Sequence, residues 1–400
     1  MIKHGALDWY RDGDEIESVI ENLLQTSPEV ARAVQQCLES RHADFFSEDE
    51  TEFASGSYYE ESRRIDTDNL DGMWANFVSS LKTESRFINH SVKATLDGIF
   101  SGVESMHAGR QLTVIMKAGP GTTIPVLYRA RWSRNTEELK RMLVLPDREL
   151  GPPPHQFSGA NRMSARGISV FYGASTVQTA IPEIRPPVGC DVVSAGFRLI
   201  RPLRLLNLPA LKSVWESGSM FDPDYTNKLA QVAFLRTLSS LMTDPVLPGE
   251  EEFHYIPTQV IAEYLADAPE LSLDGILYSS VQNPALSASE HYNVVLFHKA
   301  SRVRYQPLPS QSSCMLSFGH QIDEHEWERD ICVTQIAENE VPATELGWYE
   351  EAPRVIDTRE PTLEVDLATV SFHHIDGVHF DFSSEPVSRS KHIMNKHGGH

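Results

Sequence analysis

Hydrophobic residues recur at helical spacing through the first hundred residues of the chain. The first such stretch runs from about residue 8 to 45, with apolar positions at Ile16, Val19, Ile20, Leu23 and Leu24. Within it, Ser27 followed by Pro28 predicts a second helix start, because a serine side chain can accept hydrogen bonds from a first helical turn. A second helical pattern covers about 70–103, and the acidic stretch 47–62 predicts a solvated connector. We therefore expect residues 1–108 to form a small helical domain.

The pattern changes near residue 112, where short β-type runs begin to alternate with helical patches. The predicted strands cover 112–116, 126–128, 168–172, 192–193, 197–200, 203–206, 276–278 and 294–297, and the predicted helices cover 176–183 and 259–268. These runs lack the regular strand–helix rhythm of a doubly wound sheet, so residues 109–307 predict an α+β domain. Residues 308–400 predict a β-rich C-terminal extension that ends in a flexible polar tail.

Composition and charge narrow the range of functions. The 400 residues are 40% hydrophobic, which allows a substantial core, and carry a net charge of -21 from 35 basic and 56 acidic side chains. This balance argues against a nucleic-acid-binding surface, although a few arginines could still form a local basic pocket. No stretch has the roughly 18 apolar residues of a membrane span, and no apolar signal segment is visible. Four scattered cysteines without a C-x-x-C pair predict free thiols, so we expect a cytoplasmic protein.

Several common sites are excluded by their missing motifs. The loop Gly119-Pro120-Gly121 lacks the G-K-[ST] ending of a phosphate-binding loop, and no G-x-G-x-x-G stands between a strand and a helix. No G-x-S-x-G elbow for a serine hydrolase is present. The histidines near residues 320 and 373 do not form H-E-x-x-H, so we expect no metal site.

Five ordered segments of the central region carry the functional signal. They are Tyr128-Arg-Ala-Arg131, Asn161-Arg-Met-Ser-Ala-Arg-Gly-Ile-Ser-Val-Phe-Tyr-Gly-Ala174, Thr176-Val-Gln-Thr-Ala-Ile-Pro-Glu183, Leu273-Asp-Gly-Ile-Leu-Tyr-Ser-Ser280 and Asn293-Val-Val-Leu-Phe297. Their order and spacing resemble the RES family, which is named for an arginine, a glutamate and a serine. The resemblance covers about residues 120–300. Ser279 stands where the family usually has proline, which leaves the family serine open between Ser279 and Ser280; alignment on Tyr278 favours Ser280.

The resemblance implies an NAD-consuming enzyme with an ADP-ribosyltransferase-like fold. Cleavage of the bond between nicotinamide and ribose passes through an oxocarbenium-like state that a carboxylate stabilises, and Glu183 would supply it. Arg129 and Ser280 would be the other catalytic residues, and Ser280 would orient a ribose or phosphate oxygen or the incoming nucleophile. Arg162 would bind the pyrophosphate together with Arg129, and Tyr172 would contact the ribose. NAD is thus expected as the substrate, with no metal.

The resemblance also implies a biological setting. RES proteins often act as toxins that deplete NAD, as glycohydrolases or phosphorylases, and are held in check by a protein antitoxin. Here the long flanking regions make regulation by the chain's own domains an alternative to a separate partner, and a homo-oligomer is compatible with either. Two other functions stay open: an ADP-ribosyltransferase that modifies a macromolecule, and a degenerate module that binds a nucleotide without turnover.

Overall fold

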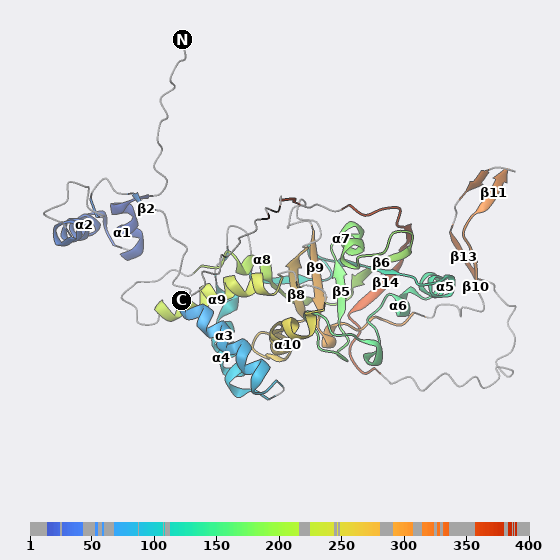
Figure 1. Cartoon of the computed structure of the whole chain (residues 1–400), viewed down its shortest axis with the longest axis horizontal. Helices are drawn as coiled ribbons and strands as arrows, with labels where there is room; N and C mark the ends of the chain where they lie inside the picture. Colours follow the sequence, from blue (N-terminus) through green and yellow to red (C-terminus); the bar gives the residue numbers. More distant parts are fainter. Residues whose placement is uncertain are drawn as a thin grey trace, which may run out of the picture.

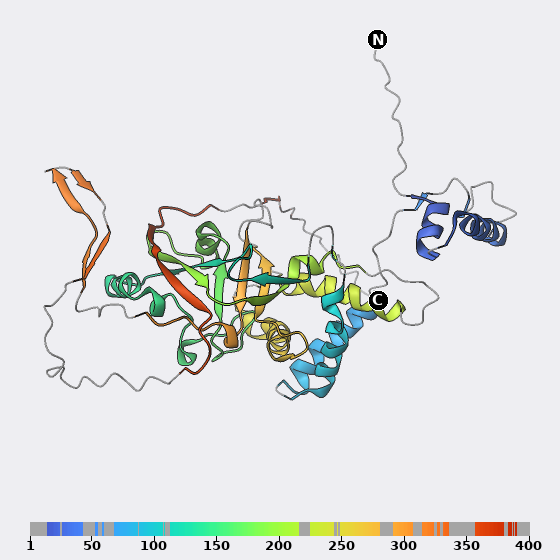
Figure 2. The same ribbon diagram turned by 180° about the vertical axis from the view of Figure 1, so that it is seen from behind.

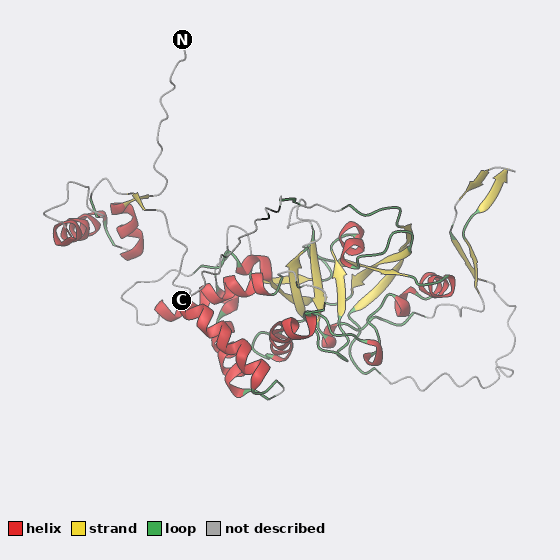
Figure 3. Cartoon of the chain, viewed as in Figure 1, coloured by secondary structure: helices red, strands yellow, loops and turns green. Residues whose placement is uncertain are grey.

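The computed structural model consists of one large mixed sheet with helices packed around it (Figures 1 and 3). This architecture confirms the predicted α+β class. The structure describes residues 14–24, 26–42, 53–54, 58–59, 68–86, 88–106, 108, 113–215, 225–243, 246, 249–280, 291–306, 314–323, 326–328, 331–335, 357–379, 383–385, 387 and 389. The expected acidic connector at 47–62 and the polar tail fall largely outside these residues.

The sheet has eight strands in the order β14-β6-β4-β5-β9-β8-β7-β3. Their bounds are β3 Ile115–Ala118, β4 Val126–Trp132, β5 Phe171–Ala174, β6 Asp191–Leu199, β7 Leu203–Asn207, β8 Gly275–Ser279, β9 Tyr292–Leu296 and β14 Leu363–His374. Only β7 and β8 run parallel among these pairs. The strand predicted at 168–172 starts three residues before the observed strand β5, which begins at Phe171. The carbonyl of Ser169 is bonded by His298 and Ser301 instead of a neighbouring strand.

The sheet opens between β4 and β5. β4 pairs with β6 along its whole length, from Val126 to Trp132, whereas its only register pair with β5 joins Tyr128 to Ala174. The residues of β4 that follow Tyr128 therefore have a strand on one side only.

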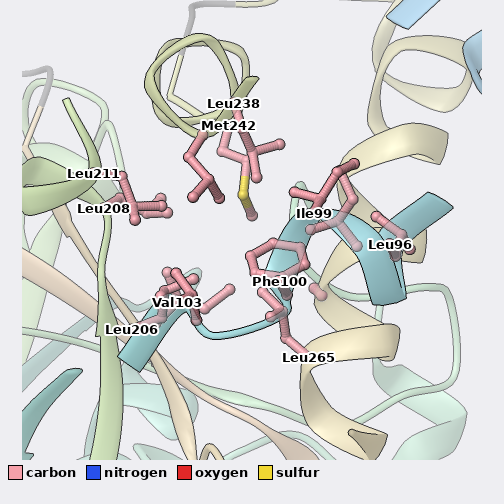
Figure 4. Close-up of a cluster of buried hydrophobic side chains, with 14 of the residues drawn as sticks. Leu96, Ile99, Phe100, Val103, Leu206, Leu208, Leu211, Leu238, Met242 and Leu265 are labelled. Carbon is pink, nitrogen blue, oxygen red and sulfur yellow. The ribbon is translucent and has the colours of Figure 1, made fainter. Parts of the chain in front are cut away.

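Helices pack against the sheet on the β7 and β8 side. They include α3 (Asp68–Thr83), α4 (His90–Phe100), α8 (Leu208–Leu211), α9 (Tyr225–Leu241) and α10 (Glu251–Asp267). Figure 4 shows where they meet: Phe100 and Leu96 of α4 lie in one cluster with Leu238, Leu265 and Leu206. Because the buried side chains come from elements on both sides of residue 108, the expected helical domain and the sheet share this core.

A second core fills the opposite part of the sheet. Phe171 and Phe197 meet edge to face there, with ring centroids 5.0 Å apart. α5 (Thr136–Val144) covers this core with its buried Leu139 and Met142, and Asn135 caps its first turn by accepting the N–H of Glu138.

The last strand of the sheet comes from the region expected to be a separate extension. β14 pairs antiparallel with β6 along the outer edge of the sheet, and its red ribbon is visible there in Figure 2. Thr369 fixes this pairing, because its Oγ1 accepts the N–H of Gly196 and donates to the carbonyl of Asp366. The boundary expected at residue 307 therefore divides elements that form one sheet, and the domain division itself stays a prediction.

Two smaller units of the described chain contribute no strand to this sheet. α1 (Ile16–Leu24) and α2 (Pro28–His42) share a small core around Ile16, Ile20 and Ala31. β10 (Cys314–Ser317) pairs with β13 (Cys332–Gln335), and β11 (His320–Asp323) pairs with β12 (Glu326–Glu328). None of the described helices is long and apolar enough to cross a bilayer.

Candidate active site

A pocket of about 560 Å³ lies where β4 and β5 separate. Its walls come from β4, the turn at 161–163, β5, α7 (Val177–Glu183), α10, β8 and β9. This volume is within the range of about 300–1,000 Å³ that small-molecule sites occupy. Among the described residues no group of three or more metal-ligating side chains gathers at one point, in the pocket or elsewhere.

Glu183 is the carboxylate of the pocket. It is the last residue of α7, a short helix that Thr176 caps at its start by accepting the N–H of Thr179. Its Oε1 accepts two hydrogen bonds, from Ser280 Oγ at 2.7 Å and from Asn293 Nδ2 at 2.7 Å. Within the described part of the chain no side chain or backbone group bonds its Oε2. The carboxylate is therefore held by one oxygen and leaves the other for a ligand.

Arg129 lies on β4 at the opening of the sheet. Its Nη1 donates to the carbonyl of Tyr172 at 3.1 Å, and its guanidinium lies 5.1 Å from the ring centre of Phe171. Burial, and then the nearby charge of Arg131, lower the pKa of Arg129 to about 9. Both causes act against the charged form, so an anion in the pocket would stabilise this guanidinium.

Three further arginines line the same pocket. Arg131 donates from Nη2 to the carbonyl of Gly151 at 3.1 Å, and burial lowers its pKa. Arg162 lies over the ring of Tyr255, 5.2 Å from its centre, and Arg185 follows Glu183 by two residues. Within the described residues none of these four arginines forms an ion pair with a carboxylate. The pocket is thus positively charged inside a chain whose net charge is -21.

Tyr172 and Tyr278 also line this pocket. Tyr172 accepts the backbone N–H of Met163 through its hydroxyl at 3.3 Å, and burial raises its pKa to about 12. Burial also raises the pKa of Tyr278 well above its usual value, and the nearby Tyr172 and Glu183 raise it further. Both phenols are therefore neutral at physiological pH and can donate a hydrogen bond or pack against a sugar or base.

The five site residues expected from sequence come together in space. Arg129, Arg162, Tyr172 and Glu183 line the pocket, and Ser280 reaches it through its hydrogen bond to Glu183. Ser280, and not Ser279, makes this bond, which favours Ser280 as the family serine. Their catalytic and binding roles stay predictions.

Sequence reasoning did not assign several other residues that the structure brings to the site. They are Asn293, Tyr278, Tyr255, Arg131 and Arg185. For Asn293 a signal existed: it is a polar residue at the start of the apolar run Asn293-Val-Val-Leu-Phe297, and it is only 3% exposed. A buried amide within a strand needs a hydrogen-bonding partner, and here that partner is Glu183.

Comparison with known proteins identifies the central region. Residues 127–316 match the family described as RES domain. This range contains every residue of the candidate site named above, and it begins within β4. No curated protein and no solved structure matches the chain. The chain therefore contains a central region, residues 127–316, that matches the RES domain family model.

Proposed function

We propose that the pocket binds NAD and that the enzyme cleaves the bond between nicotinamide and ribose. One observation carries the proposal: a single carboxylate, held by two donors, stands among four arginines that form no ion pairs in the described chain. A dinucleotide matches this arrangement because its pyrophosphate is anionic and its reacting ribose becomes cationic as the bond breaks. RES-domain proteins generally act on NAD, which agrees with the proposal.

The chemistry needs few groups. As the glycosidic bond breaks, its electron pair goes to the nicotinamide nitrogen, which becomes neutral and leaves without a general acid. Positive charge then develops on the ribose ring, and the free oxygen of Glu183 stabilises it. Arg129 and Arg162 hold the pyrophosphate, and an oxygen nucleophile, from water or phosphate, bonds to the ribose carbon and loses its proton to solvent.

The wider setting is part of the same proposal. The opened sheet with its pocket at the break supports an ADP-ribosyltransferase-like arrangement. We further propose a cytoplasmic, NAD-depleting toxin or defence effector, restrained by a protein partner or by the chain's own flanking regions. The four pocket arginines form no ion pair with a carboxylate of the described residues, which suits an anionic substrate.

The decisive experiment incubates the purified full chain with NAD, with and without phosphate, and identifies the products. Free nicotinamide with ADP-ribose indicates hydrolysis, and a phosphorylated ADP-ribose indicates phosphorolysis. Glu183→Gln preserves shape and removes the charge, so we expect most turnover to be lost. Glu360→Gln, an exposed glutamate outside the pocket, is the matched control and should keep full activity.

Two outcomes would redirect the proposal. Labelled ADP-ribose attached to a protein would indicate a transferase that modifies a macromolecule. NAD binding without nicotinamide release would indicate a binding module, and full activity in Glu183→Gln would remove this carboxylate from the mechanism.

A further inference from the structure

We infer that Asn293 and Ser280 are positioning residues that act on the substrate only through Glu183. They bond the same oxygen, Oε1, each at 2.7 Å, and thereby leave Oε2 for the ribose. This role differs from direct contact of Ser280 with a ribose, a phosphate or the incoming nucleophile. The inference rests on the proposed function, because it concerns how the proposed catalytic carboxylate is oriented.

The placement of Asn293 is hard to explain by stability alone. The residue lies within β9, between β5 and β8, where it pairs with Ala174 and Tyr278 and is 3% exposed. An apolar β-branched residue would suit such a central strand better, because a buried amide lowers stability unless its hydrogen bonds are made. The amide instead donates to Glu183, so its position serves the carboxylate.

The position of Glu183 also calls for such support. It ends a helix of seven residues, and the partial negative charge of a helix C-terminus disfavours a carboxylate there. Two donors on Oε1 offset this effect and fix the rotation of the carboxylate. A group that stabilises developing charge works best when it is oriented before the reaction begins.

A second set of contacts ties the start of the same helix to the same strand end. Thr179 Oγ1 lies 2.9 Å from His291 Nδ1, and Ser175 Oγ accepts the N–H of Tyr292 at 3.2 Å. The two ends of the segment 175–183 are therefore anchored on residues 291–293. Asn293 is the part of this anchor that touches the reacting group itself.

Double-mutant cycles separate positioning from direct substrate contact. We expect Asn293→Ala and Ser280→Ala each to lower kcat roughly 10- to 100-fold, while KM changes by less than about threefold. In a Glu183→Gln background each further substitution should change kcat by less than about threefold, because the group that they orient is already lost. If Ser280→Ala lowers kcat equally in both backgrounds, Ser280 contacts the substrate directly and the inference fails for it.

Asn207→Ala is the matched control for the loss of a buried asparagine. Asn207 is also 3% exposed and hydrogen bonded, to the carbonyl of Thr113 and the N–H of Ala210, but it does not line the pocket. This variant should unfold at a lower temperature and keep its kcat. An equal fall of kcat in both asparagine variants would make the Asn293 effect merely structural.

A pH profile gives a readout that a structural role would not produce. Asn293→Asp sets a second carboxyl against Glu183, and the pair can share one proton in acid but repels when both are ionised. The other ionisable side chains that line the same pocket are the guanidinium groups and phenols of Arg129, Arg131, Arg162, Arg185, Tyr128, Tyr172, Tyr255 and Tyr278, and the imidazole of His291 lies two residues before Asn293. Activity of this variant should therefore survive best in acid and disappear as the pH rises, whereas Asn293→Ala should follow the wild-type profile at a lower level. Matching profiles for the two variants would overturn the inference.

Crystal structures distinguish failure of this inference from failure of the proposed function. If the wild type does not cleave NAD, the proposed function fails, but the orientation of Glu183 can still be compared between the wild type and Asn293→Ala. We expect the carboxylate to rotate or adopt two conformers in the variant. An unchanged, fully ordered Glu183 would refute the positioning role whatever the activity.

Discussion

Substitution of Arg129 by methionine should separate ligand affinity from stability. Methionine replaces the apolar stem of the arginine side chain but removes the charge and its donors. A depression of the pKa of Arg129 from 12.5 to about 9 corresponds to roughly 3–5 kcal/mol against the charged form in the folded state. This figure is an upper bound, because the side chain keeps some surface in a pocket that water can enter.

The substitution also removes favourable contacts. The carbonyl of Tyr172 loses its donor, which costs roughly 1–3 kcal/mol, and the contact with the ring of Phe171 contributes roughly 0.5–1 kcal/mol. Gains and losses nearly cancel, so we expect the unfolding free energy to change by less than about 2 kcal/mol at neutral pH. The sign follows from linkage: since the folded pKa lies below the unfolded value, the contribution of Arg129 to stability should rise with pH above about 9, so the stability of the wild type relative to the variant should rise there.

Binding should change much more than stability. A charge-assisted hydrogen bond to phosphate contributes roughly 1.5–3 kcal/mol, so the Kd for NAD should rise about 10- to 150-fold. Urea unfolding with and without a non-cleavable NAD analogue measures both quantities on one sample. At an analogue concentration of about 100 times the wild-type Kd, the analogue should stabilise the wild type by about 2.7 kcal/mol and the variant by about 0.3–1.4 kcal/mol.

Arg198→Met is the control on the neighbouring strand. Arg198 is exposed and pairs with Glu364, so its loss should cost less than about 1 kcal/mol and leave the analogue affinity unchanged. The reasoning is refuted if Arg129→Met loses more than about 3 kcal/mol of stability and binds the analogue normally, because that is the behaviour of an arginine buried for structure.

Three further predictions concern the candidate site and the sheet that supports it. Arg162→Ala should weaken the affinity for the NAD analogue about 10-fold or more at low salt, and calorimetry that finds an unchanged Kd would exclude this arginine from the pyrophosphate site. Gly275→Ala places a Cβ 2.3 Å from the carbonyl of Val295, so chemical denaturation should show a loss of roughly 2 kcal/mol or more, and a stable variant would contradict the close strand approach. Burial lowers the pKa of His373, which lies beside Ser194, so the fold should lose stability as the pH falls below about 6.5; His373→Gln should lose less over that range, and parallel Tm curves would count against this cause.

The strands at the centre of the sheet could be predicted because each contains a short run of hydrophobic residues in the sequence. The runs 203–206 and 276–278 are mostly apolar, with Arg204 as the charged exception, and both lie within strands of the sheet. α10 begins at Glu251, earlier than the predicted 259, because sequence rules place a boundary near Pro257 and here the proline lies inside the helix. The pairing of β14 with β6 depends on contacts between residues more than 160 positions apart, and no local pattern encodes it.

The candidate site could likewise be predicted only in part, because some of its contacts depend on residues far apart in the sequence. Arg129, Glu183 and Ser280 stand within ordered segments that resemble a family, and the structure brings their side chains to one place. The bond between Asn293 and Glu183 joins residues 110 positions apart and follows from the register of β9 beside β8 and β5. The sequence can therefore identify the residues that are expected to take part in the chemistry. Which of their side chains form hydrogen bonds with one another depends on the register of the strands.

The outer position of β14 has a practical consequence for anyone who isolates the RES domain. The family match ends at residue 316, whereas β14 occupies 363–374, so a fragment cut at the family boundary would leave the backbone of β6 without its neighbour. An unpaired strand edge invites pairing with other chains, and such a fragment should tend to aggregate. During synthesis the same edge stays open until residues 363–374 emerge from the ribosome, long after β6 at 191–199, so this pairing cannot form early in folding.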